Sequence, residues 1–207
     1  MSRTRIKICG ITRDADLQSV LAAGADAVGF VFYPPSPRCL AFEQANFLAR
    51  RVPPFVTRVG LFVNAAAAEV RAALEAVPLD LLQFHGDEDA GYCEQFRRPY
   101  IKAARVRPGL DLVEFARRHP SAQGLLLDAF VDGYGGGGQC FDWSLVPQAL
   151  SLSMILSGGL HATNVGEAVR ILRPWAVDVS SGVELAKGVK DAAKINAFVS
   201  AVRNAEP

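Results

Sequence analysis

The sequence predicts an α/β fold, a single (β/α)8 or TIM barrel that spans residues 1–207. Eight short apolar runs alternate with segments of helical periodicity, and the ends of the runs recur every ~20–30 residues, the length of one βα unit. The runs are apolar almost throughout, which is typical of parallel strands buried on both faces. No linker, low-complexity segment or strong internal repeat divides the chain, so one domain is expected.

The main alternative is an open, doubly wound parallel sheet. Members of that class that bind dinucleotides carry a glycine-rich turn after the first strand. The first predicted turn here, Cys9-Gly10-Ile11-Thr12, lacks that pattern. The closed barrel is therefore favoured, with little room for insertions, because such barrels typically run to ~250 residues.

Eight β-strands are predicted from the apolar and β-branched runs. In chain order they are Arg5–Cys9, Ala27–Val31, Val56–Phe62, Leu79–Phe84, Tyr100–Ala104, Gly124–Asp128, Met154–Ser157 and Ala176–Ser180. Because all eight would run parallel, their carboxyl ends are expected to meet at one end of the barrel.

The segment after the first strand has clear helical spacing. Leu17, Val20 and Leu21 repeat at i, i+3 and i+4, which predicts a helix with one buried face. Thr12 is the predicted N-cap of this helix, and Gly24 stands where a C-terminal glycine is common.

Three further helices are predicted in the same way. Asn64 is expected to cap the second, which Pro78 stops, and Asn164 with Glu167 resembles a capping box at the start of the third. Their apolar stripes are Val70, Ala73, Leu74 and Val77; Val165, Ala168, Val169 and Leu172; and Ala192, Ile195, Val199 and Val202. Helices after the second, fourth, fifth and sixth strands are less clear, especially around Asp111–His119.

Composition and charge exclude several classes of partner. A formal net charge of +1 gives no global field to attract nucleic acid or an anionic membrane. The stretch from Leu145 to Arg170 is interrupted by Pro147 and Gly158-Gly159, so no membrane span is predicted. The four cysteines are widely spaced and the three histidines are scattered, which predicts no metal site. Met1–Thr4 leads directly into a strand instead of a signal-peptide core, so a cytoplasmic location is expected.

The catalytic groups of a barrel lie at the carboxyl ends of its strands and in the loops that follow. This rule selects Cys9, Arg38, His85 and Asp128. Cys9 precedes a predicted helix N-terminus, which is expected to lower its thiol pKa. Each residue also has a plainer explanation: a buried inert thiol for Cys9, a solvated surface group for Arg38, an orienting role for His85, and a loop cap or arginine partner for Asp128.

Two turns rich in glycine and serine predict an anion site. They are Ser157-Gly158-Gly159 after the seventh strand and Ser180-Ser181-Gly182 after the eighth. Backbone N–H groups at such turns approach an anion closely, and barrels commonly hold a phosphate at this place. Either turn alone could be a simple tight turn. A third glycine-rich stretch, Gly135–Gly138, could fold over a ligand as a lid or have no role.

Taken together, these segments resemble the phosphoribosylanthranilate isomerase family over nearly the whole chain. The matching segments are Lys7–Thr12, Gly29–Phe32, Ser36–Arg38, Gly60–Asn64, Leu82–Gly86, Leu127-Asp128, Gly138, Phe141–Trp143, Ser157–Leu160, Asn164-Val165, Asp178–Glu184 and Gly188–Asp191.

The resemblance implies a (β/α)8 barrel and an isomerase of tryptophan biosynthesis. The implied reaction is the Amadori rearrangement of N-(5-phosphoribosyl)anthranilate to 1-(2-carboxyphenylamino)-1-deoxyribulose 5-phosphate, with no cofactor and no metal. By the same resemblance, Asp128 is the general acid and Cys9 the general base, and Arg38 grips the anthranilate carboxylate. The residues assigned to substrate binding are Arg38, His85, Gly158, Gly159, Ser180, Ser181 and Gly182.

Two other functions stay open at this point. A related phosphosugar aminoaldose isomerase of the histidine pathway is expected to carry aspartate where this chain has Cys9. A catalytically silent phosphate-binding barrel would have no need of Cys9, Asp128 and Arg38 together. The expected partner is the small-molecule phosphosugar-anthranilate substrate, and the sequence does not distinguish a monomer from a homodimer.

Overall fold

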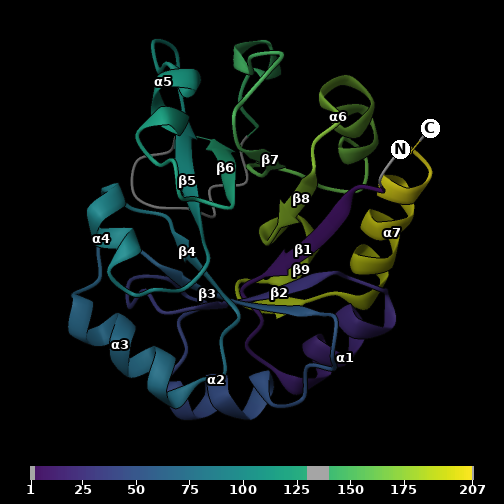
Figure 1. Ribbon diagram of the computed structural model, residues 1–207. Helices are drawn as coiled ribbons and strands as arrows, with labels where there is room; N and C mark the ends of the chain where they lie inside the picture. The colour runs from purple at the N-terminus through teal and green to yellow at the C-terminus, as the bar shows by residue number, and fades with distance from the viewer. Residues whose placement is uncertain (1–2, 130–139, 207) are drawn as a thin grey trace.

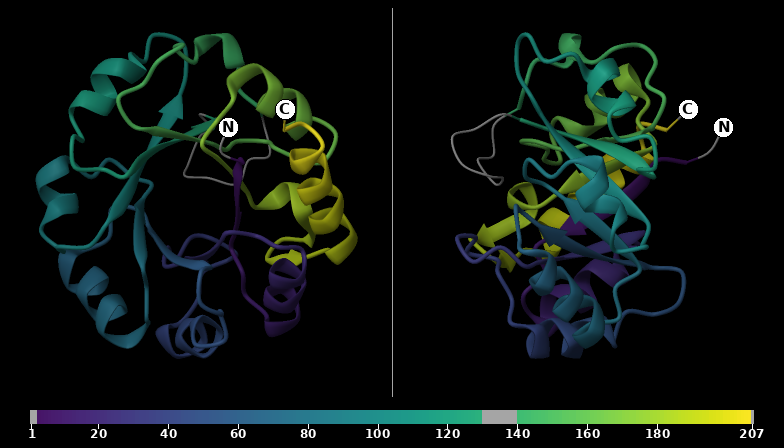
Figure 2. Two further views of the ribbon diagram at one scale, coloured as in Figure 1. Left: turned by 45° about the vertical axis from the view of Figure 1, so that its right-hand side comes forward. Right: turned by 60° about the vertical axis from the view of Figure 1, so that its left-hand side comes forward.

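The barrel predicted from the sequence is confirmed by the architecture of the chain. A computed structural model describes residues 3–129 and 140–206. Eight parallel strands follow one another around a closed barrel in the order of the sequence, and β1 pairs with both β2 and β8. The helices surround the strands as an outer ring (Figures 1 and 2).

The observed strands agree closely with the predicted ones. They are β1 (Arg5–Cys9), β2 (Ala27–Val31), β3 (Thr57–Phe62), β4 (Leu81–Phe84), β5 (Tyr100–Val106), β6 (Gly124–Ala129), β7 (Ser153–Leu156) and β8 (Ala176–Val179). A short antiparallel hairpin of β9 (Glu184–Ala186) and β10 (Val189–Lys190) follows β8.

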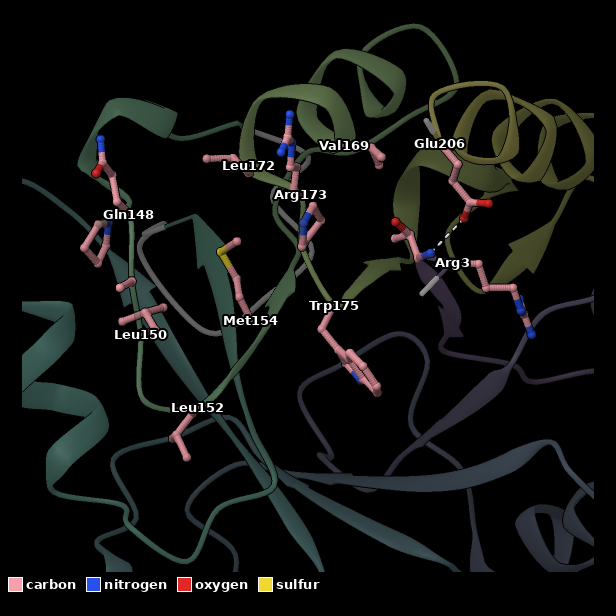
Figure 3. A pocket seen from close by; sticks show the side chains of 14 residues that line it. Arg3, Gln148, Leu150, Leu152, Met154, Val169, Leu172, Arg173, Trp175 and Glu206 are labelled. Carbon is pink, nitrogen blue, oxygen red and sulfur yellow. Dashed lines mark hydrogen bonds between the residues drawn. The ribbon is translucent and has the colours of Figure 1, made fainter. Parts of the chain in front are cut away.

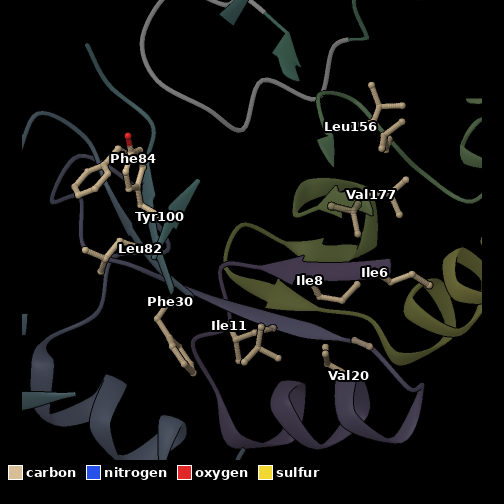
Figure 4. Packing of buried hydrophobic residues seen from close by; sticks show 14 of the residues in the cluster. Ile6, Ile8, Ile11, Val20, Phe30, Leu82, Phe84, Tyr100, Leu156 and Val177 are labelled. Atoms are coloured by element: carbon tan, nitrogen blue, oxygen red, sulfur yellow. The ribbon is translucent and has the colours of Figure 1, made fainter. Parts of the chain in front are cut away.

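Side chains alternate along each strand between the ring of helices and the barrel interior. On β1, Ile6 and Ile8 join the large apolar cluster that also contains Val20 of α1 (Asp14–Ala22) (Figure 4). Lys7 and Cys9 alternate with them and therefore take the opposite face, inside the barrel.

The barrel interior changes from apolar to polar along its length. A small separate cluster of Ile101, Ala103, Leu126, Ile155 and Ala176 fills the part nearer the amino ends of β5 to β8. Two residues further along β6 and β8, the same faces carry Asp128 and Asp178. The polar side chains therefore gather at the carboxyl end.

The connecting helices vary in length. They are α1 (Asp14–Ala22), α2 (Phe42–Ala49), α3 (Ala67–Ala76), α4 (Ala90–Glu94), α5 (Leu112–Arg117), α6 (Val165–Leu172) and α7 (Ala192–Arg203). The five residues of α4 and six of α5 are too few to show an apolar stripe, which explains their weak sequence pattern. In its described part, the connection from β6 to β7 holds only a 3-10 turn, Trp143–Leu145. No helix among the described residues has the length and apolar character to cross a membrane.

Two of the predicted helix caps are wrong because their side chains bond to other loops. Helix α1 has Arg13 as its N-cap, and the Thr12 hydroxyl instead donates to the carbonyl of Gly188 over 2.5 Å. Helix α3 starts later than predicted, and the Asn64 side chain accepts from the backbone N–H of Asp87 over 2.7 Å.

Asn164 occupies the N-cap position of α6, as predicted, but its side chain makes no capping hydrogen bond. Its Oδ1 accepts from the backbone N–H of His161 (2.8 Å), and its Nδ2 donates to the carbonyl of Gly159 (3.0 Å). The residue therefore ties the start of α6 to the turn that follows β7.

Candidate active site

Cys9 and Asp128 both lie inside the barrel near its carboxyl end. Cys9 is the last residue of β1 and is 6% exposed, and Asp128 is the penultimate residue of β6 and is 8% exposed. The strands β7 and β8 separate them around the barrel wall. Their side chains therefore approach the interior from different sides.

The Cys9 thiol lies beside a buried ion pair. Lys7 Nζ donates to Asp178 Oδ1 over 2.9 Å, and all three side chains are nearly inaccessible to water. Gly29 on β2 makes room for the thiol, because a Cβ at that position would lie 2.6 Å from the Cys9 sulfur.

The electrostatics of the thiol differ from the prediction. Burial raises the pKa of Cys9 above its ordinary value, although the Lys7 ammonium opposes this. Burial also works to lower the pKa of Lys7, but the attraction of Asp178 and Cys9 outweighs it, so the pKa of Lys7 is raised and the side chain stays charged. The predicted lowering by a helix N-terminus is wrong because α1 begins only at Asp14, and a helix dipole acts within its first turn.

Asp128 is hydrogen-bonded to His85 in a row of three side chains. His85 Nε2 lies 3.0 Å from Asp128 Oδ2, and His85 Nδ1 lies 2.9 Å from Nε2 of Gln83. The backbone N–H of Ala129 donates to the other carboxyl oxygen of Asp128 over 3.0 Å. His85 thus contacts the carboxyl group directly, and an orienting role for it was one of the readings of the sequence.

Arg38 is buried and paired with the Glu184 carboxylate, so it is not a solvated surface residue. Its Nε and Nη2 donate to the two carboxylate oxygens of Glu184, each over 2.7 Å, and Lys190 Nζ donates to the same carboxylate over 2.9 Å. Burial works to raise the pKa of Glu184, but these two cations overcome it and lower the pKa. Gly10 lets the arginine cross the end of β1, because a Cβ there would lie 2.4 Å from Arg38 Cδ.

The two glycine-serine turns are packed against each other, as expected for adjacent strand ends. A Cβ at Gly182 would lie 1.9 Å from the carbonyl oxygen of Leu160, so no larger residue fits there. Gly158 and Gly159 have φ angles of 81° and 62°, in the left-handed region that favours glycine. Lys190 Nζ donates to both the carbonyl and the hydroxyl of Ser180 (3.1 and 3.2 Å), which places a positive charge beneath this turn.

Several polar residues of the site were not selected from the sequence. Lys7, Gln83 and Asp178 each lie two positions before a residue that was selected, in strands that are otherwise apolar except for Arg5 at the start of β1. Since alternate residues of a strand share a face, this spacing was the signal that could have found them. The lid proposed at Gly135–Gly138 lies outside the described residues, and within those residues no group of three or more His, Cys, Asp or Glu could hold a metal ion.

A cavity of about 560 Å³ lies at the opposite end of the barrel. Its lining includes Thr4, Leu152 and Trp175, which directly precede β1, β7 and β8 (Figure 3). It is therefore separate from the polar groups described above, which occupy the carboxyl ends of the strands.

The sequence matches a known enzyme family over most of its length. The family model described as N-(5'phosphoribosyl)anthranilate (PRA) isomerase matches residues 6–201. The N-(5'-phosphoribosyl)anthranilate isomerase of Dechloromonas aromatica is 65% identical over 204 residues, which cover 99% of this chain and 98% of that protein.

Solved structures support the same relationship. The phosphoribosyl anthranilate isomerase of Thermus thermophilus has a TM-score of 0.89 and 37% identity, covering 98% of this chain and 100% of that one. A phosphoribosyl anthranilate isomerase crystallised with reduced 1-(o-carboxyphenylamino)-1-deoxyribulose 5-phosphate has a TM-score of 0.87 and 38% identity, covering 97% and 99% of the two chains. The chain therefore belongs to the family of N-(5'-phosphoribosyl)anthranilate isomerases.

Proposed function

We propose that this chain converts N-(5-phosphoribosyl)anthranilate to 1-(2-carboxyphenylamino)-1-deoxyribulose 5-phosphate by general acid–base catalysis with Asp128 and Cys9. Family membership makes the chain an isomerase of tryptophan biosynthesis. A relative 38% identical to it binds a reduced form of the proposed product. The observation that carries the proposal is the placement of Cys9 and Asp128 on separated strands that face one barrel interior.

Asp128 is the proposed general acid. Its proton passes to the furanose ring oxygen, the bond from that oxygen to C1 breaks, and the anthranilate nitrogen lone pair forms a C=N bond to C1. The imine nitrogen is then the electron sink for the next step, so the side chains need only move protons. His85 and the Ala129 N–H support this role, because each holds one carboxyl oxygen of Asp128.

Cys9 is the proposed general base. It removes the proton from C2, the C–H electrons form a C1=C2 bond, and the resulting enolamine tautomerises to the ketone. Only the thiolate can accept this proton. Burial raises the pKa of the thiol, and the Lys7 ammonium beside it is the group that most favours ionisation.

Arg38 is the proposed partner of the anthranilate carboxylate. Glu184 engages its Nε and Nη2, which holds the planar guanidinium in one orientation at the carboxyl end of the barrel. An arginine fork suits a carboxylate better than the compact charge of lysine. An Arg38→Lys enzyme is therefore expected to show a raised KM with a smaller change in kcat, measured by steady-state kinetics, and an unchanged KM would contradict the role.

The turns at Gly158-Gly159 and Ser180-Ser181-Gly182 are the proposed phosphate site. Their glycine conformations and close packing allow backbone N–H groups to approach an anion, and the buried Lys190 contributes positive charge under Ser180. His85 and Arg38 complete the proposed substrate-binding set.

The decisive experiment follows the fluorescence of freshly generated phosphoribosylanthranilate as the purified chain consumes it. Cys9→Ser and Asp128→Asn are each expected to lower kcat by roughly two orders of magnitude or more, because each removes one proton-transfer group.

Matched substitutions away from the site serve as controls. Cys93→Ser changes another buried cysteine, on α4, and Asp111→Asn changes the N-cap of α5 for another good capping residue. Both are expected to keep near-wild-type kcat. Near-wild-type turnover by Cys9→Ser or Asp128→Asn would refute the corresponding assignment.

A further inference from the structure

Gln83 lies two residues before His85 on β4, and its side chain is completely buried. Its amide nitrogen is 2.9 Å from Nδ1 of His85, and Nε2 of His85 is 3.0 Å from Oδ2 of Asp128. The three side chains therefore form a hydrogen-bonded row that begins at a neutral amide and ends at the proposed acid.

The chemistry of the amide fixes where the imidazole proton lies. An amide nitrogen only donates hydrogen bonds, so Nδ1 of His85 must accept and carries no proton. A neutral imidazole then has its proton on Nε2, which donates to Asp128. Gln83 in this orientation thus selects one of the two tautomers of His85.

The opposite orientation of the amide is disfavoured by its surroundings. The Gln83 Oε1 atom is buried and has no hydrogen-bond partner among the described residues. Rotating the amide by 180° would place its NH2 group, with two N–H donors, at this position without a partner. A buried donor without a partner is rarer in proteins than an under-satisfied carbonyl oxygen, so the observed orientation is the better one.

We propose that Gln83 is a positioning residue of the isomerisation, which holds His85 as the neutral Nε2–H tautomer so that an N–H points at Asp128. The inference rests on the proposed role of Asp128 as the general acid. When Asp128 gives up its proton, the carboxylate that forms receives a charge-assisted hydrogen bond from Nε2–H, and such bonds are stronger than those to a neutral acid. An interaction that strengthens as the proton leaves lowers the barrier to ring opening.

The tautomer can be observed directly in the unmodified enzyme. A long-range ¹H–¹⁵N correlation spectrum of ¹⁵N-labelled protein, recorded near pH 8 and so above the ordinary histidine pKa of ~6.5, separates protonated from unprotonated ring nitrogens. The chain has three histidines, and His85→Gln identifies the signal of interest by its loss. The expected spectrum shows His85 with a bare Nδ1 and a protonated Nε2.

Two substitutions then test whether Gln83 sets this state. Gln83→Glu keeps the size of the side chain but offers Nδ1 an acceptor, so a proton is expected to appear on Nδ1. Gln83→Met removes the donor at nearly constant length and should leave a mixture of tautomers. Both are expected to lower kcat by about tenfold or more with little change in KM, since a mispositioned proton affects the transition state more than binding.

Gln123→Glu makes the same chemical change at an exposed position and should alter neither the His85 spectrum nor kcat. A wild-type spectrum with Nδ1 protonated overturns the inference, whatever the activity. An unchanged tautomer in Gln83→Glu, or a changed tautomer with unchanged kcat, also overturns it. Full turnover by Asp128→Asn instead overturns the acid assignment, and with it the catalytic role of Gln83.

Discussion

At the scale of single residues, Lys7 is the charge that most favours ionisation of the proposed base. Its ammonium lowers the pKa of Cys9 against the larger effect of burial. A Lys7→Met enzyme is therefore expected to have a still higher thiol pKa. The rise of kcat/KM with pH should move to higher pH, because less thiolate is present at any given pH. A pH profile of kcat/KM measures the shift.

Two companion variants separate this effect from damage to the fold. Lys7→Arg keeps the positive charge, so its profile should shift much less. Lys7→Met leaves Asp178 buried without its cation, which commonly costs about 3–5 kcal/mol of stability. The double variant Lys7→Met/Asp178→Asn removes that unpaired charge, but it also removes a carboxylate that raises the pKa of Cys9, so its profile should shift less than that of Lys7→Met. A profile of folded Lys7→Met that is unchanged from wild type would contradict the role of Lys7.

The residues of the candidate site could be selected from the sequence, but their hydrogen-bond and ion-pair partners could not. Cys9, His85 and Asp128 are selected by their positions at strand ends, and Arg38 by its position in the loop after β2. The pairing of Arg38 with Glu184 joins residues 146 positions apart, and that of His85 with Asp128 joins residues 43 apart. Such contacts depend on the curvature of the closed barrel, which no local pattern encodes.

At the scale of elements, the loop after β7 is constrained by its glycines. Gly158 and Gly24 have nearly equal φ angles, 81° and 79°, but different surroundings. A Cβ at Gly158 would lie 2.6 Å from the backbone nitrogen of Ala129, whereas nothing lies within 4 Å of a Cβ at Gly24.

Gly24→Ala is therefore expected to lower the free energy of unfolding by about 1–2 kcal/mol, which is the cost of holding an alanine in the left-handed backbone conformation. Gly158→Ala adds a collision with backbone atoms and should cost about 1–3 kcal/mol more. Urea unfolding of the two variants compares them directly. If both variants lost the same free energy of unfolding, the loop after β7 would have to shift easily to accept the extra methyl group. That outcome would contradict the close packing of Gly158 against Ala129.

Three predicted side-chain caps do not form, for a common physical reason, although Asn164 does occupy the N-cap position of α6. Thr12, Asn64 and Asn164 are good capping residues in isolation. Each forms hydrogen bonds that tie it into its loop surroundings: Thr12 to the carbonyl of Gly188, Asn64 to the N–H of Asp87, and Asn164 to the N–H of His161 and the carbonyl of Gly159. Tertiary contacts therefore decided where these side chains bond, while the apolar stripes correctly predicted the helices themselves.

At the scale of the whole molecule, the strand order was predictable, and so was the end of the barrel at which the candidate site residues gather. Eight buried apolar runs at regular spacing allow few other arrangements, and parallel strands bring their carboxyl ends together. The division of the interior into an apolar part and a polar part was not predicted as such. The division depends on which side chains of neighbouring strands lie at the same level inside the barrel. Those levels are set by the pairing register of the strands, which the sequence pattern does not give.

The ion pair of Lys7 with Asp178 joins the first barrel strand to the last, across 171 residues of sequence. Contacts between residues so far apart in sequence form only at a large loss of chain entropy, and they therefore tend to form late in folding. While the protein is being synthesised, β1 leaves the ribosome long before β8, and Lys7 has no Asp178 to meet. The electrostatic environment of Cys9 is consequently complete only once the last strand closes the barrel, so in a nascent or truncated chain the proposed base lacks the charges that surround it in the folded protein.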